Sequence, residues 1–174
     1  MSERRIIVDH LKFSYEGLFN VDEMYTTIVQ WFYEKGWDWY EKMNQEQVTE
    51  TGKHIKLVLE PWKNLSDYHR EEMRIRIIMT DVKEVDVEFE GKTMRMHQGL
   101  IKIVFDGYLK TDRHGWWSDN IFWWWVTYLF DRILMRDHFK KAESWVESDV
   151  QDVFEKIKVY LNAYNYTYRN KQLE

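Results

Sequence analysis

Apolar and polar residues alternate along several stretches of the chain, and this period of two is typical of strands that bury one face. The alternation covers residues 5–16, where Asp9 stands at an otherwise apolar position, and it returns at 55–59, 73–79 and 85–89. These segments are separated by short polar stretches. The pattern therefore predicts a series of strands joined by turns, which pair antiparallel with their neighbours.

One further strand is predicted at residues 93–109, after a tight turn at residues 90–92, and its apolar positions change parity halfway. The even-numbered Met94 and Met96 precede the odd-numbered Ile101, Ile103 and Phe105. One additional residue would place all five side chains on the same face. We therefore expect a β-bulge at Gln98-Gly99.

Helical spacing of apolar residues replaces the alternation at 20–35 and at 142–163. Asn20 precedes the first of these segments, and Glu23 follows three residues later, which predicts an N-cap at Asn20. Gly36 is a natural end for that helix. A frayed tail is expected at 165–174.

A tryptophan-rich segment at 116–139 contains three consecutive tryptophans at 123–125. Within it, a helix over 118–136 would place one set of side chains on a single side: Ile121, Trp125, Tyr128, Leu129 and Ile133. A buried strand over 116–126 remains the alternative. The same helix would place three further apolar side chains elsewhere on its circumference, those of Trp123, Phe130 and Leu134. We therefore expect another surface, such as a second subunit, to cover them.

The order of strand, helix, antiparallel strands and helix predicts an α+β domain that covers residues 1–174. Its curved antiparallel sheet should carry a helix after the first strand and one or two long C-terminal helices. This order resembles the START-like (polyketide cyclase/Bet v 1-type) superfamily. The matching stretches are the strand Ile6–Tyr15, the phrase Leu18–Tyr25 leading into the helix, the meander 70–109 and the helix 148–163. The tryptophan-rich segment departs from that pattern.

The resemblance implies a cavity that binds a hydrophobic small molecule, because the superfamily contains lipid, sterol and other hydrophobic-ligand binders, besides cyclases and co-chaperones. On this reading the candidate ligand-binding residues are Trp116, Trp117, Trp125, Tyr128, Arg95 and His97. Arg95 and His97 would orient an anionic head group if they face the cavity. The alternative function is that of a homo-oligomer or partner-binding protein, with an interface at Trp123, Phe130 and Leu134.

The composition and the motifs of the chain exclude several classes of site and function. The net charge is −5 and there is no cysteine, so disulfides and cysteine zinc sites are excluded, and no basic stripe suited to nucleic acid is present. Phosphate-binding loops and hydrolase elbows are missing from the sequence, so an enzyme ranks below a binding module. Asp131, Asp137 and His138 are read as a charged helix face rather than a metal site, and no cofactor is expected. The N-terminus lacks a signal peptide, so we expect a cytoplasmic protein without a membrane span.

Overall fold

The computed structural model describes residues 4–66, 69–89, 92–111 and 136–171. Its elements are β1 (Arg4–Phe19), α1 (Val21–Glu34), β2 (Glu41–Val48), β3 (Lys53–Leu59), β4 (Trp62–Asn64), β5 (His69–Phe89), β6 (Lys92–Thr111) and α3 (Arg136–Lys171). The short strand β4 was not predicted, because its three residues are too few to show a period.

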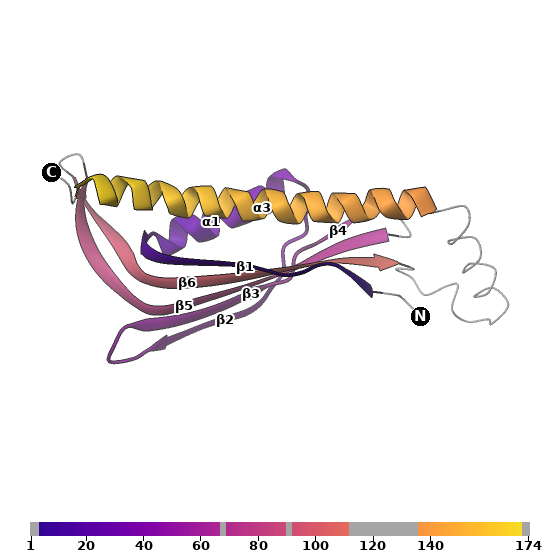
Figure 1. Ribbon diagram of the computed structural model, residues 1–174. Coiled ribbons are helices and arrows are strands. Elements are labelled where there is room, and N and C mark those ends of the chain that lie inside the picture. The colour runs from indigo at the N-terminus through magenta and orange to yellow at the C-terminus, as the bar shows by residue number, and fades with distance from the viewer. Residues whose placement is uncertain (1–3, 67–68, 90–91, 112–135, 172–174) are drawn as a thin grey trace.

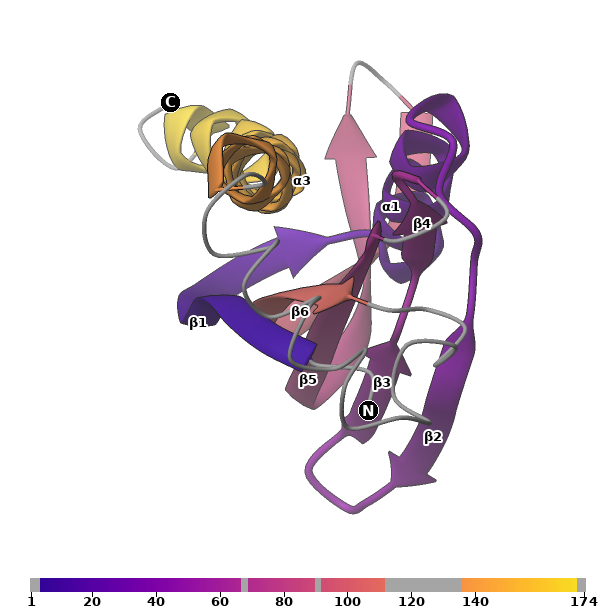
Figure 2. The same cartoon turned by 90° about the vertical axis from the view of Figure 1, so that its right-hand side faces the viewer.

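The sheet is antiparallel and runs in the order β1-β6-β5-β3-β2, with β4 paired to β5. Strand β1 therefore lies beside β6, which is far from it in the sequence. The sheet is curved, and both helices lie side by side over its concave face (Figure 1, Figure 2). The predicted α+β class, the helix after the first strand and the curvature are thus found in the structure.

Helix α1 begins and ends where the sequence predicted. The side chain of Asn20 accepts hydrogen bonds from the backbone N–H groups of Asp22 and Glu23, at 3.1 and 3.2 Å. Two N–H groups that the first helical turn cannot pair internally are satisfied in this way. At the other end Gly36 has a φ of +72°, a left-handed conformation that glycine adopts without strain.

An irregularity lies where the sequence predicted one, at Gly99, but the additional residue is in β5. The pairing shifts between Thr80 and Lys83, so that Asp81 and Val82 together lie opposite Gly99. A Cβ atom at Gly99 would lie 3.0 Å from the backbone oxygen of Thr80, which explains the glycine.

The prediction that the bulge places all five apolar residues of β6 on one face is therefore wrong. At Gly99 strand β6 pairs with β1 without interruption, so its side chains keep alternating. Met94 and Met96 consequently lie on the face opposite to Ile101, where Met94 is 42% exposed and Met96 is buried outside the main core cluster.

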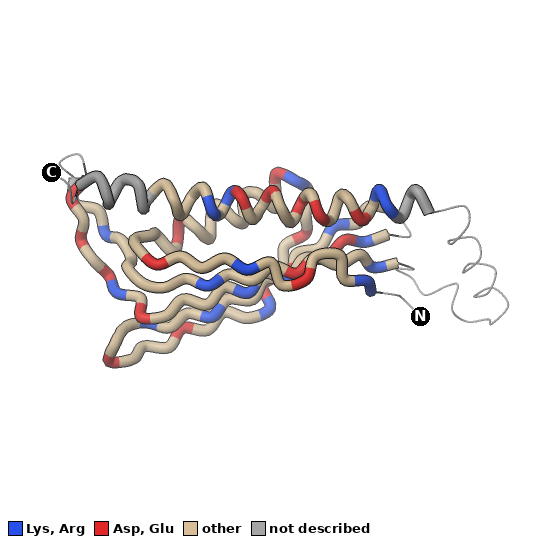
Figure 3. The backbone as a smooth tube through the Cα atoms, viewed as in Figure 1, with Lys and Arg blue, Asp and Glu red and all other residues tan. Residues whose placement is uncertain are grey.

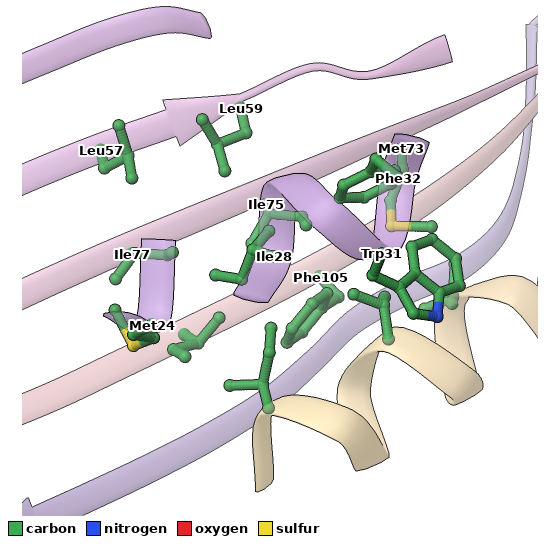
Figure 4. Packing of buried hydrophobic residues seen from close by; sticks show 14 of the residues in the cluster. Met24, Ile28, Trp31, Phe32, Leu57, Leu59, Met73, Ile75, Ile77 and Phe105 are labelled. Carbon is green, nitrogen blue, oxygen red and sulfur yellow. The ribbon is translucent and has the colours of Figure 1, made fainter. Parts of the chain in front are cut away.

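Helix α3 packs against β1 and β6 and begins and ends outside the predicted 142–163. The helical spacing predicted over 142–163 is found in its buried residues Val146, Val150, Val153, Ile157 and Leu161, to which Ala142 is added, whereas Phe154 and Tyr160 of the predicted stripe are only partly buried. Helix α1 contributes Met24, Ile28, Trp31 and Phe32 to the same core (Figure 4). The space between sheet and helices is thus filled by large side chains over most of its length.

An aromatic cluster surrounds the end of α1. Phe32 contacts Trp31, Trp37 and Trp39, with ring centroids 4.9, 5.5 and 5.7 Å apart. Trp37 and Trp39 lie in the link between α1 and β2, because β2 starts only at Glu41. Burial of these rings against α1 stabilises the extended link between the two elements.

Candidate functional site

Most of the predicted site residues lie outside the described part of the chain. These are Trp116, Trp117, Trp125 and Tyr128 of the predicted ligand site, and Trp123, Phe130 and Leu134 of the predicted interface. Arg95 and His97 are described, and the two lie in different surroundings.

Arg95 is directed at carboxylates on the surface. Its side chain is 73% exposed, and its guanidinium lies 3.8 Å from Glu84 and 3.9 Å from Asp86. His97 is half-buried and stacks on Phe19, with ring centroids 6.2 Å apart. Its Nδ1 accepts a hydrogen bond of 3.5 Å from the backbone N–H of Val21, so the imidazole packs at the N-terminus of α1.

The described residues contain an unusual group that sequence reasoning did not single out, the carboxyl of Glu71. Glu71 lies near the start of β5 and is completely buried. Neither of its carboxyl oxygens has a hydrogen-bond partner in the described part of the structure. A buried polar group without a hydrogen-bond partner costs about 1–3 kcal/mol, and the ammonium of Lys63, 3.7 Å away, offsets only part of this cost.

Three neighbouring side chains complete what we call the Glu71 site, defined as Lys63, Glu71, Asp149 and Trp37. Lys63 of β4 is the cross-strand partner of Glu71, and its Nζ lies 3.7 Å from the carboxyl. The same Nζ lies 3.9 Å from Asp149 of α3. The indole N–H of Trp37 donates to Asp149 at 3.2 Å, which fixes that carboxylate above the sheet.

The electrostatics of the site raise the pKa of Glu71 to about 7. Burial is the main cause, because it disfavours the charged form, and the negative charge of Asp149 adds to it. Lys63 opposes both effects. At neutral pH the carboxyl is therefore close to half protonated, so it can either accept or donate a hydrogen bond.

Apolar side chains surround the carboxyl on the concave face. Leu109 of β6 pairs with Glu71 from the side opposite Lys63, and both Leu109 and Met73 are buried. With Trp37, whose indole binds Asp149, they form an apolar wall beside the two carboxyls of the site. Polar groups placed inside an apolar wall are typical of small-molecule sites.

The sequence did contain a signal for Glu71. It precedes Met73, Ile75 and Ile77 at the same parity, so the alternation assigns it to the buried face. A charged residue at a buried position of a strand is a candidate functional residue.

Charged residues elsewhere are interspersed, with acidic and basic positions following one another along the strands and α3 (Figure 3). Among the described residues, no helix combines the length and apolar character needed to cross a bilayer. No protein-family model matches the chain, and searches of curated proteins and of solved structures found no match either.

Proposed function

We propose that the chain is a non-enzymatic binding module that holds a hydrophobic small molecule between the concave face of the sheet and α3. The observation that carries this proposal is the buried carboxyl of Glu71, whose oxygens have no hydrogen-bond partner among the described residues. A ligand that donates a hydrogen bond to Glu71 would remove the cost of this unpaired group.

The charges around Glu71 favour a ligand with an amine or hydroxyl head group. Lys63 lies at 3.7 Å from one carboxyl and 3.9 Å from the other, so a single ammonium faces two acids. A second cation or a neutral donor fits this excess of negative charge, whereas an anionic head would be repelled. This differs from the sequence-based expectation of an anionic head held by Arg95 and His97.

The apolar body of the ligand would pack against Trp37, Met73 and Leu109, which surround the carboxyl. These side chains are buried, so entry requires α3 to move away from β4 and β5. Helix α3 packs mainly on β1 and β6 and also on α1, so such a movement would have to break the hydrogen bond from Trp37 to Asp149.

The test compares amphiphiles that share one alkyl chain and differ only in the head group. Dodecylamine, dodecanol and dodecanoate would be titrated into the protein below their micellar concentrations, with tryptophan fluorescence and calorimetry as readouts. We expect the amine to bind most tightly and dodecanoate least. The variant Glu71→Gln should weaken dodecylamine binding about tenfold to a hundredfold, since hydrogen bonds to charged groups contribute roughly 1.5–3 kcal/mol.

Glu72→Gln is the matched control, because Glu72 is the next residue along β5 and its carboxylate pairs with Arg4 at 3.2 Å. Successive strand residues point to opposite faces, so this substitution removes the same charge from the other side of the sheet. Equal losses of affinity in the two variants would assign the effect to net charge and contradict a site at Glu71.

A further inference from the structure

A second irregularity of the sheet lies in β1 and places three candidate metal ligands together on the sheet, away from the Glu71 site. Between Val8, which pairs with Gly107, and Leu11, which pairs with Phe105, strand β1 contains Asp9 and His10. These two residues lie opposite the single residue Asp106. Adjacent strand residues normally point to opposite faces, but a bulge changes the direction of one of them.

The backbone of His10 provides that change. Its φ is +52°, a left-handed conformation that residues other than glycine adopt rarely. As a result, His10 and Asp9 both approach Asp106. One ligand atom from each of the three residues lies within 4.8 Å of the other two.

Asp106 is held in a fixed orientation while one of its oxygens remains directed at the group. The guanidinium of Arg76 binds Oδ2 at 2.7 Å, and the backbone N–H of His10 donates to Oδ1 at 3.0 Å. Oδ1 also lies 3.6 Å from Nδ1 of His10, and the same nitrogen contacts Oδ1 of Asp9. Two ligands of one metal ion, each at about 2.1 Å, are separated by a similar distance.

We propose that Asp9, His10 and Asp106 bind a divalent transition-metal cation, with Zn²⁺ as the representative ion. One imidazole nitrogen and two carboxylate oxygens suit Zn²⁺ and its neighbours, whereas Ca²⁺ and Mg²⁺ prefer oxygen ligands alone. Arg76 acts as an outer partner that orients the buried carboxylate, as is usual around metal ligands.

The site would keep coordination positions open to solvent. The side chain of Asp106 is 3% exposed, but those of His10 and Asp9 are 53% and 66% exposed. Three protein ligands at the surface leave room for water or for an exchangeable ligand in a fourth position.

The same sheet contains a matched control at the bulge of β5. Asp81 also has a positive φ, of 55°, and lies 3.9 Å from the imidazole of His54. Among the described residues, its other partner is the hydroxyl of Thr51, which donates to Asp81 at 2.9 Å and takes the place of a second carboxylate. A strained bulge with one His–Asp pair is thus present at both places, but among the described residues a third ligand lies only beside His10.

The experiment titrates Zn²⁺ alone into the full chain by calorimetry, with His10→Ala and His54→Ala compared to wild type. We expect one Zn²⁺ per chain and a loss of affinity of at least about tenfold in His10→Ala. His54→Ala should bind as wild type does. Absence of zinc binding, or equal binding by wild type and His10→Ala, would overturn the proposal.

A second measurement keeps the test valid if His10→Ala folds poorly. Asp9→Asn alters an exposed side chain and should weaken Zn²⁺ binding while leaving the melting temperature of the metal-free protein unchanged. In NMR spectra, Mn²⁺ should broaden the ring signals of His10 before those of the other five of the chain's six histidines. Earlier broadening of another histidine, or a wild-type affinity in Asp9→Asn, would contradict the metal site. Asp9, His10 and Asp106 would then be joined only by ion pairs and hydrogen bonds.

Discussion

Replacing Glu71 by glutamine removes an ionisable group from the interior and should change how the stability of the protein depends on pH. The ordinary pKa of this carboxyl is 4.5, and burial together with Asp149 raises it to about 7 in the folded protein. The folded state therefore binds a proton more tightly than the unfolded chain does. Between these two pKa values the free energy of unfolding falls as the pH rises.

The magnitude follows from the difference between the two pKa values. Each unit of pKa is worth about 1.36 kcal/mol, so ionised Glu71 destabilises the folded protein by about 3 kcal/mol above pH 7. Little of this penalty is present below pH 4.5. About 2.5 kcal/mol of it develops between about pH 5 and pH 8.

The assay is urea denaturation of the wild-type protein and of Glu71→Gln, each measured at about pH 5 and at about pH 8. The variant should gain about 2.5 kcal/mol relative to wild type between about pH 5 and pH 8. Any destabilisation by the buried amide of the variant that does not depend on pH cancels in this comparison. A difference between the two proteins that is the same at both pH values would refute the argument that burial controls this carboxyl.

Asp149→Asn provides an internal check on the cause. Asp149 is the second contributor to the raised pKa of Glu71, after burial. Its neutralisation should move the pH midpoint of the destabilisation downward while Trp37 keeps an oxygen acceptor at the same place. A midpoint that does not move would leave burial as the only cause.

Four further predictions concern other parts of the chain. Asn20→Ala should lower the free energy of unfolding by about 1 kcal/mol in urea denaturation, because two N–H groups lose their acceptor. Gly99→Ala should lower the melting temperature, because its Cβ would lie 3.0 Å from the rigid backbone oxygen of Thr80. Sedimentation should show self-association that the double substitution Trp123→Lys, Leu134→Lys abolishes; a monomeric wild type would contradict the predicted interface. The net charge of −5 predicts no duplex binding in gel shifts at physiological salt.

The spacing of apolar residues was sufficient to predict the elements whose own residues mark both their ends and their buried side. The first helix was predicted because its cap, its apolar side and its terminal glycine agree. The stripe of α3 was likewise predictable, but its start was not, because no capping residue marks Arg136 in the pattern. Helix ends depend on the neighbouring chain as well as on spacing.

The sequence of one strand does not show which of two paired strands contains the extra residue of a β-bulge. The parity change in β6 was visible in the sequence, yet the extra residue belongs to β5, since pairing joins two strands and either can contain it. In β1, Asp9 was noticed as an exception to the alternation, but its proximity to Asp106 depends on pairing between distant segments. The candidate sites were therefore only partly predictable from the sequence.

The position of β1 beside β6 has a consequence for how the chain reaches its native state. Arg4 pairs with Lys110, so β1 has no neighbour in the described sheet until β6 has been synthesised. Strand β1 must remain unpaired while β2 to β5 can already form local hairpins. Closing so long a loop is slow and is typical of proteins that fold in milliseconds to seconds. In the meantime, the edge of β1 and the apolar surface of β6 that will receive it are open to other chains, which makes this pairing the step most exposed to aggregation.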